Sequence, residues 1–289
     1  MFFAPIYIEE THRFSLLDLK TLIYSSKTFR GDFMRIVIKV GTSTLTHQNG
    51  NINIRRIENL CKVISDLKNA GLEVILVSSG AIAMGVGKLG LNEKPQDIPT
   101  KQACAAIGQC ELMYVYDKLF QEYNHTVAQI LMTGADFENQ ERYDNFQNTM
   151  DRLLELGVLP IINENDTIAT SEIKVGDNDT LSAITAVGTH ADLLILLSDI
   201  DGLYTADPHQ VEDATLIPEV KEITDDILEL AGAAGTALGT GGMVTKLSAA
   251  KLCMDAGTDM IIANGSNPSV LYDIFEGKTV GTRFIGKDN

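Results

Sequence analysis

The stretch RIVIKVGTS, residues 35–43, decides the fold class of this chain, because a near-continuous apolar run leads directly into a glycine turn. Such runs, rich in Val, Ile and Leu, are typical of strands that are buried on both faces of a parallel sheet. Further runs of this kind follow along the chain and predict a series of buried strands. They span residues 73–77, 126–132, 158–162, 193–197 and 260–263.

Helical patterns separate these runs. Residues 54–70 are followed by Gly71, and residues 243–256 by Gly257, the residue type that commonly ends a helix. The alternation predicts an α/β fold, a three-layer α/β/α sandwich around a mainly parallel central sheet. In such sheets ligands bind beyond the carboxyl ends of the strands, so the turns there should carry the chemistry. The apolar stripe of the first helical segment consists of Ile54, Ile57, Leu60, Ile64 and Leu67.

Composition disfavours several functions. The 289 residues correspond, at about 150 residues per domain, to two domains or one large α/β unit. A formal net charge of −16 repels phosphate backbones, which argues against a nucleic-acid partner. No apolar run approaches the ~18 residues of a membrane span, so we expect no membrane partner. The four cysteines contain no C-x-x-C pair, and we expect reduced thiols that fill the core of a cytoplasmic protein.

Residues 1–33 differ from the rest of the chain. They carry four acidic and four basic residues and are therefore neutral, so the whole net charge lies in the remainder. They lack the apolar core and small-residue end of a signal peptide. We interpret them as an N-terminal extension of low order, or as the product of a start codon assigned too early, since Met34 opens the first strand pattern.

Two lysines lie in turns that could meet an anion. Lys39 is near the end of the first strand, where burial is costly without an anionic partner, and Gly41 would let the backbone approach that anion. This motif alone fits an exposed strand-end lysine at least as well. Lys246 follows the glycines of residues 239–242 into a helix. Backbone N–H groups, the helix dipole and the ammonium group together predict a phosphate cradle, in preference to a flexible linker.

Glycines and small residues follow the second strand. The turn at residues 78–83, SSGAIA, could present hydroxyl and N–H groups to an anion, or be a plain small-residue turn. Residues 85–90 match G-x-G-x-x-G, but they neither follow a strand directly nor clearly open a helix, as a dinucleotide site requires. We therefore interpret residues 85–90 as a flexible loop that could serve as a substrate lid. No Walker A sequence occurs in the chain.

Two clusters of Asn, Asp and Glu follow the fourth strand, at residues 163–166 and 175–180. Together they supply hydrogen-bond donors and acceptors, which suits a zwitterionic ligand with carboxylate and ammonium groups. Chelation of a divalent metal is the alternative. An Asx-turn or a helix N-cap would explain one of these residues but not six. The turn at residues 198–208, SDIDGLYTADP, is by itself best interpreted as a loop.

The motifs together resemble the glutamate 5-kinases of the amino-acid kinase family, over a match that runs from Met34 to the C-terminus. The resemblance implies the amino-acid kinase fold and an ATP-dependent transfer of phosphate to the side-chain carboxylate of L-glutamate, the first step of proline synthesis. Alternatives are a related kinase for N-acetylglutamate, aspartate or UMP, and a non-catalytic amino-acid sensor. The motifs lie at residues 39–43, 78–82, 163–166, 175–179, 202–208 and 239–246.

The resemblance also implies roles for individual residues. Lys39 and Lys246 would neutralise the transferring phosphate, and Asp179 would hold both lysines in place. Mg²⁺ would accompany ATP, with no protein metal site. Glutamate would be bound by Ser79, Asp166 and Asn178, with Asn163 nearby. ATP would be bound by Lys39, Ser198, Asp199, Thr240, Gly241, Gly242, Met243, Val244, Thr245 and Lys246.

Further expectations concern organisation and partners. Residues 34–289 would form one kinase domain, with a glutamate-binding N-terminal part and an ATP-binding C-terminal part. Many members of the family carry an additional RNA-binding-like domain of the PUA type, which we do not expect here. The resemblance further implies feedback inhibition by proline, assembly into a homodimer or tetramer, and hand-off of the product to glutamyl-phosphate reductase.

Overall fold

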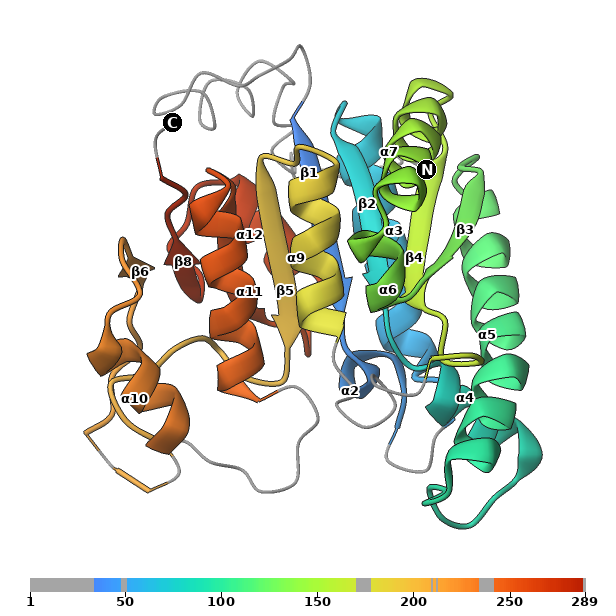
Figure 1. Cartoon of the computed structure of the whole chain (residues 1–289), viewed down its shortest axis with the longest axis horizontal. Coiled ribbons are helices and arrows are strands. Elements are labelled where there is room, and N and C mark those ends of the chain that lie inside the picture. The colour runs from blue at the N-terminus through green and yellow to red at the C-terminus, as the bar shows by residue number, and fades with distance from the viewer. Residues whose placement is uncertain are drawn as a thin grey trace, which may run out of the picture.

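A computed structural model of the chain describes residues 34–47, 51–169, 178–208, 210–211, 213–233 and 242–287. In these residues the strands form one sheet of eight in the order β3-β4-β2-β1-β5-β7-β8-β6 (Figure 1). The N-terminal extension expected at residues 1–33 lies outside the described residues. The strands are β1 Arg35–Val40, β2 Glu73–Ser78, β3 Val127–Met132, β4 Leu159–Glu164, β5 Leu193–Ser198, β6 Glu219–Val220, β7 Asp259–Asn264 and β8 Thr282–Phe284.

The sheet is mainly parallel, as the apolar runs predicted. β1 lies in its centre and pairs in parallel with β2 on one side and β5 on the other, with Val40 opposite both Ser78 and Leu197. This register brings the carboxyl ends of the three strands to one edge of the sheet. The antiparallel pairing of β7 with β8 is the exception. β6 and β8 were not predicted, because strands of two and three residues contain no apolar run.

Helices cover both faces of the sheet and confirm the three-layer sandwich. Alternate residues of β1 enter different cores: Ile36 and Ile38 pack with α3, α5 and α12, whereas Val37 packs with α7, α9 and α11. Figure 1 shows α9 and α11 side by side; α9 packs on β1 and β5, and α11 packs on β7. The helices are α2 Thr42–Leu45, α3 Ile54–Asn69, α4 Ala81–Leu89, α5 Ile98–Gln121, α6 Gly134–Glu138, α7 Gln140–Glu155, α9 Asn178–Gly188, α10 Asp225–Ala233, α11 Met243–Asp255 and α12 Val270–Phe275.

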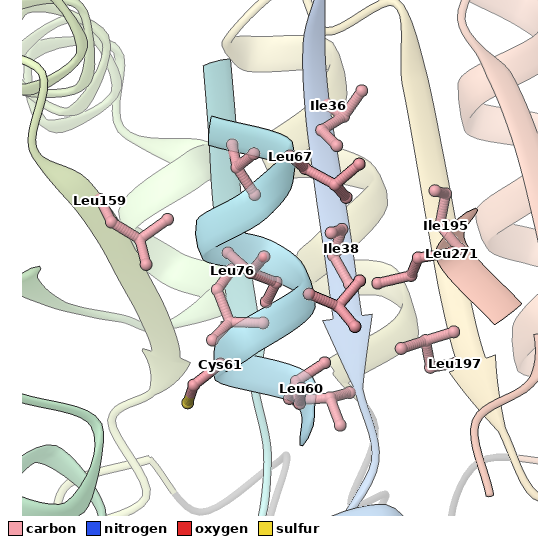
Figure 2. Close-up of a cluster of buried hydrophobic side chains, with 14 of the residues drawn as sticks. Ile36, Ile38, Leu60, Cys61, Leu67, Leu76, Leu159, Ile195, Leu197 and Leu271 are labelled. Carbon is pink, nitrogen blue, oxygen red and sulfur yellow. The ribbon is translucent and has the colours of Figure 1, made fainter. Parts of the chain in front are cut away.

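Helix α3 shows how the sequence pattern produces one of these layers. Its N-cap Asn53 accepts a hydrogen bond from the backbone N–H of Arg56, and it ends before Gly71, whose φ of 95° suits a residue without a side chain. Leu60 and Leu67 point from α3 toward β1 (Figure 2). Each fully buried aliphatic side chain contributes about 1.5–3 kcal/mol. Ile54, expected in the same stripe, is instead 63% exposed at the first turn.

The interpretation of residues 85–90 as a flexible loop and substrate lid is wrong. These residues form the second half of α4 and its C-cap, where Gly90 has a φ of 65°. The glycine spacing serves helix packing, because α4 crosses α5 at very short range. A Cβ atom on Gly85 would overlap the backbone carbonyl of Cys104, and one on Gly108 would overlap that of Ala81. Glycine pairs of this kind are invisible to a motif search, since the two glycines lie on different helices and meet only when these helices pack together.

The cysteines follow the expected pattern with one exception. Cys61, Cys104 and Cys253 are buried, but Cys110 is exposed on α5 and does not fill the core. All four thiols are free. Burial raises the pKa of the Cys253 thiol to about 12, which keeps it protonated and unreactive at neutral pH. Among the described residues, no helix is both long enough and apolar enough to cross a membrane.

We expect Gly108→Ala to lower the free energy of unfolding by about 1–3 kcal/mol, the usual cost of overpacking. Alanine has a higher helix propensity than glycine by about 1 kcal/mol. That gain is smaller than the overlap penalty, because the added methyl group meets backbone atoms that cannot rotate away. Urea titration measures the effect, with Ala106→Ser on the exposed side of α5 as control. A variant as stable as the wild type would contradict the close helix crossing.

Candidate active site

Three buried charges in the described residues form a cluster of two lysines around one carboxylate. The Nζ atom of Lys39 lies 2.6 Å from Oδ1 of Asp179, and Nζ of Lys246 lies 3.0 Å from Oδ2. Asp179 is fully buried, while Lys39 and Lys246 are 8% and 4% exposed. Each carboxylate oxygen therefore binds a different ammonium group, and the three side chains together carry a charge of +1.

Three elements place these groups. Lys39 is the penultimate residue of β1 and shares with Val37 the face that α9 and α11 cover. Asp179 is the second residue of α9. Lys246 lies in the first turns of α11, where Thr245 Oγ1 donates to Asp179 Oδ2 over 3.2 Å. The cluster therefore forms only when a strand and two helices, far apart in sequence, are all docked.

The surroundings of Asp179 affect its ionisation in two opposing ways. Burial by itself would raise the pKa of the carboxyl group, because the charged form loses its hydration. The charges and hydrogen bonds of Lys39 and Lys246 outweigh burial and hold the pKa below its ordinary value. Asp179 is thus an anion at neutral pH.

The backbone at Gly41 lies close to one of the ammonium groups. A Cβ atom on Gly41 would lie 3.9 Å from Nζ of Lys39, in van der Waals contact with it. The glycine was predicted to allow close approach of an anion, and its position beside Nζ is consistent with that prediction. A net positive, largely dehydrated cluster can attract an anion.

A second cluster, made of amides and hydroxyls, lies beside the first. Asn178, at the start of α9, directs its Nδ2 atom at Ser79 Oγ, at the backbone oxygen of Ser78, and at Asn163 Oδ1, over 2.9, 2.9 and 3.0 Å. Asn163 also accepts from the backbone N–H of Glu164. These residues come from the carboxyl ends of β2 and β4 and from α9, so the edge of the sheet predicted to bind ligands carries them.

The amide cluster contains one residue that the sequence pattern missed. Gln109 of α5 accepts a 2.8 Å hydrogen bond from Asn163 Nδ2 and is 7% exposed. The available signal was a polar side chain within a helix whose neighbouring positions are apolar. Such a signal does not indicate which distant residue the amide contacts.

The remaining predicted residues are placed as follows. Asp166 is half-buried, two residues beyond β4. Ser198 ends β5, and its hydroxyl donates to Asp199 over 3.2 Å. The cluster at residues 163–166 begins inside β4 rather than after it, because that strand extends to Glu164. Gly242 caps α11, and Met243, Val244 and Thr245 form its first turn. Outside the described residues lie Thr240, Gly241 and positions 175–177.

Similarity to known proteins shows the family to which this chain belongs. The family model of the amino acid kinase family matches residues 34–264. The chain belongs to the amino acid kinase family. This kinase is 56% identical over 260 residues to the glutamate 5-kinase of Clostridium perfringens, covering 89% of this chain and 97% of that protein. It is 54% identical over 256 residues to the glutamate 5-kinase of Caldanaerobacter subterraneus, covering 89% and 69%.

Solved structures share the fold of this amino acid kinase. The carbamate kinase from Giardia lamblia bound to AMP-PNP has a TM-score of 0.61 at 20% identity, covering 89% of this chain and 99% of that one. The UMP kinase from Ureaplasma parvum has a TM-score of 0.59 at 16% identity, covering 88% and 100%. At these identities the likeness concerns the fold, and it confirms the amino-acid kinase fold expected from the motifs.

We expect Asp179→Asn to destabilise the kinase by about 3–5 kcal/mol at pH 7, because two dehydrated ammonium groups lose their shared carboxylate. The difference in the free energy of unfolding between variant and wild type should shrink as pH falls. A lowered native pKa stabilises the fold above the unfolded-state value of about 3.9, and this stabilisation is lost as pH falls through the native value.

Urea titrations of both proteins between pH 3 and pH 7 measure this effect. Asp117→Asn, at an exposed position of α5, is the control for removing one carboxylate without breaking a buried pair. Equal stability of Asp179→Asn and wild type at pH 7, or a gap that widens in acid, would contradict the buried ion pairs.

Proposed function

We propose that this protein transfers the γ-phosphoryl group of ATP to the side-chain carboxylate of L-glutamate, forming L-glutamyl 5-phosphate in the first step of proline biosynthesis. The observation that carries the proposal is the pair of ammonium groups, Lys39 and Lys246, brought together on Asp179 beside the amide cluster. Identities above 50% to glutamate 5-kinases over most of the chain support the choice of glutamate as acceptor.

The chemistry needs positive charge more than it needs a base. The γ-carboxyl group of glutamate has a pKa of about 4.3, so the nucleophile is already ionised at neutral pH. The obstacle is repulsion between this carboxylate and the phosphates. Two like charges about 4 Å apart cost about 4 kcal/mol at an effective dielectric constant of 20. Lys39 and Lys246 offset that repulsion while they hold the reacting groups in line.

The acceptor amino acid fits the amide cluster. Its carboxylate oxygens need N–H and O–H donors, which the Ser79 hydroxyl and the second N–H of Asn163 Nδ2 can supply. Asn178 already directs Nδ2 at protein oxygen atoms, so it presents Oδ1 as an acceptor for the ammonium group. Its ammonium group needs an anion or a carbonyl oxygen, and Asp166 is the carboxylate assigned to it here. Glutamate bound in this way has its side chain directed toward the lysines, because Asn178 and Asp179 are consecutive at the start of α9.

The nucleotide fits the neighbouring end of the sheet. Ser198 ends β5 and Asp199 follows it. Gly242 caps α11 and residues 243–246 begin it, and the N-terminus of a helix favours negative charge. Lysine near a helix N-terminus opposes the helix dipole, and Lys246 therefore makes physical sense where a triphosphate is bound. The γ-phosphate would reach Lys246 and Lys39 from this side.

Magnesium would enter with ATP. Mg²⁺ prefers oxygen ligands, and in phosphotransferases it uses substrate phosphates together with one or two carboxylates. Within the described ranges, no three His, Cys, Asp or Glu side chains gather into a group that could hold a metal ion. Phosphate oxygens would therefore supply most of its ligands, and its charge would lower the repulsion on the triphosphate. Inhibition by proline, assembly into a dimer or tetramer, cytoplasmic location and hand-off to glutamyl-phosphate reductase stay predictions.

The purified protein should release ADP from MgATP with L-glutamate, and hydroxylamine should trap the acyl phosphate as a hydroxamate. N-acetylglutamate, aspartate and UMP in parallel reactions separate the related kinases, since UMP yields no hydroxamate. ADP release at higher kcat/KM with any of these than with glutamate would overturn the choice of acceptor. Binding of glutamate without ADP release would instead support the non-catalytic sensor.

Lys39→Met and Lys246→Met should each lower kcat by about 10²-fold or more, the loss typical for one donor to a developing charge. Methionine keeps the length of the apolar stem, and Asp179 retains the other lysine in each variant. Melting temperatures show whether the fold persists, and Lys118→Met on the exposed side of α5 is the control. A folded variant with kcat within threefold of wild type would remove that lysine from the mechanism.

A further inference from the structure

Gln109 belongs to none of the motifs that carry the family resemblance, yet it is buried behind the proposed glutamate site. It lies on α5, outside the central sheet, and its Oε1 atom accepts a 2.8 Å hydrogen bond from Asn163 Nδ2. A buried carboxamide is costly unless it is hydrogen-bonded, so this contact favours one orientation of the Gln109 side chain.

The contact also determines which way Asn163 faces. With its Nδ2 directed at Gln109, Asn163 turns Oδ1 toward the backbone N–H of Glu164 and toward Asn178 Nδ2, over 2.9 and 3.0 Å. The reverse orientation would place two NH₂ groups against each other at the contact with Asn178. It would also place an NH₂ group against a backbone N–H.

Asn178 is oriented in turn by the same pattern. Its Nδ2 atom has three acceptors on one side: Asn163 Oδ1, Ser79 Oγ and the backbone oxygen of Ser78. The two polar atoms of a carboxamide point in different directions, so its Oδ1 atom faces away from these groups. The acceptor on α5 thus reinforces a polarity that two backbone groups, Glu164 N–H and the Ser78 oxygen, also require.

We propose that Gln109 is a positioning residue for the acceptor site, which orients Asn163 and, through it, Asn178. The inference rests on the proposed function, since it assigns these two amides to glutamate binding. Gln109 contacts neither reacting group. It acts by disfavouring the rotated states of the two amides. In such a state of Asn178, an NH₂ group would replace the Oδ1 atom that faces the substrate.

Tyr116 provides a matched comparison. It lies two helical turns after Gln109 on α5, is fully buried, and its hydroxyl forms a 2.9 Å hydrogen bond with Ser78 Oγ. Tyr116→Phe therefore removes a buried hydrogen bond between the same helix and the neighbouring strand end. It leaves the amide pairs between Gln109, Asn163 and Asn178 in place. A general loosening of α5 would affect both positions alike, whereas loss of amide polarity would affect Gln109 alone.

Steady-state kinetics test the proposal. Gln109→Met has a side chain of similar length without an acceptor, and it should raise KM for glutamate about tenfold while KM for ATP stays within twofold. Gln109→Glu keeps an acceptor for Asn163 Nδ2 and should restore KM for glutamate to within about threefold of wild type. Tyr116→Phe should leave KM for glutamate within twofold, whatever its melting temperature.

A double-mutant cycle shows whether Gln109 acts through its neighbour. Asn163→Ala should itself raise KM for glutamate, and adding Gln109→Met to it should change KM by less than twofold, because the two effects share one pathway. Should Gln109→Met fail to fold, Gln109→Asn replaces it. The shorter amide withdraws the acceptor from Asn163, and the same rise in KM is expected.

The outcomes separate this inference from the proposed function. Wild-type protein that turns over ATP with glutamate, together with a folded Gln109→Met of unchanged KM, overturns the positioning role alone. The positioning role is also overturned if Gln109→Met raises KM equally for glutamate and ATP, or if Gln109→Met and Tyr116→Phe raise KM for glutamate equally. Additive effects in the double-mutant cycle overturn it as well. Wild-type protein without activity on glutamate overturns the proposed function instead.

Discussion

The Asp179 carboxylate, bound by two ammonium groups in the interior, is the interaction on which the rest of the site depends. Removing an ion from water costs several kcal/mol, and the cost is offset here only when Lys39 and Lys246 reach Asp179 together. That requirement couples β1 to α9 and α11, since each contributes one of the charges. The same arrangement leaves one positive charge in excess, which a phosphate group can use. Stability and the proposed phosphate binding thus depend on one cluster.

The N-terminus of α9 connects this cluster to the amide cluster. Asn178 contacts residues from the ends of β2 and β4, and Asp179 contacts lysines from β1 and α11. Two neighbouring positions of one helix therefore link the proposed acceptor site to the proposed phosphate site. Because a helix is rigid over such a short distance, the separation between the two sites is well defined. Gln109 extends the support outward to α5.

Local patterns predicted much of this structure, and their failures have a common cause. All six apolar runs are strands, and five of them are buried nearly throughout, which produces a near-continuous apolar run in the sequence itself; β3, at the sheet edge, is only half-buried. The pairing of Lys39 and Lys246 with one carboxylate came from the family resemblance and is present. The spacing at residues 85–90 misled, since Gly85 serves the crossing of α4 and α5 and Gly90 caps α4. Ile54 and Cys110 look like core residues by type but face outward.

The sequence by itself determined which segments are strands and helices and which residue types occupy the turns between them. These features depend on neighbours within a few positions, such as apolar periodicity and glycine at helix ends. Only the tertiary structure decided which turns meet. The order β4-β2-β1-β5 brings together carboxyl ends that lie up to 158 residues apart, from Val40 to Ser198. Hydrogen bonds such as that between Gln109 and Asn163 depend on how a helix docks on the sheet. No periodic pattern in the sequence indicates that docking.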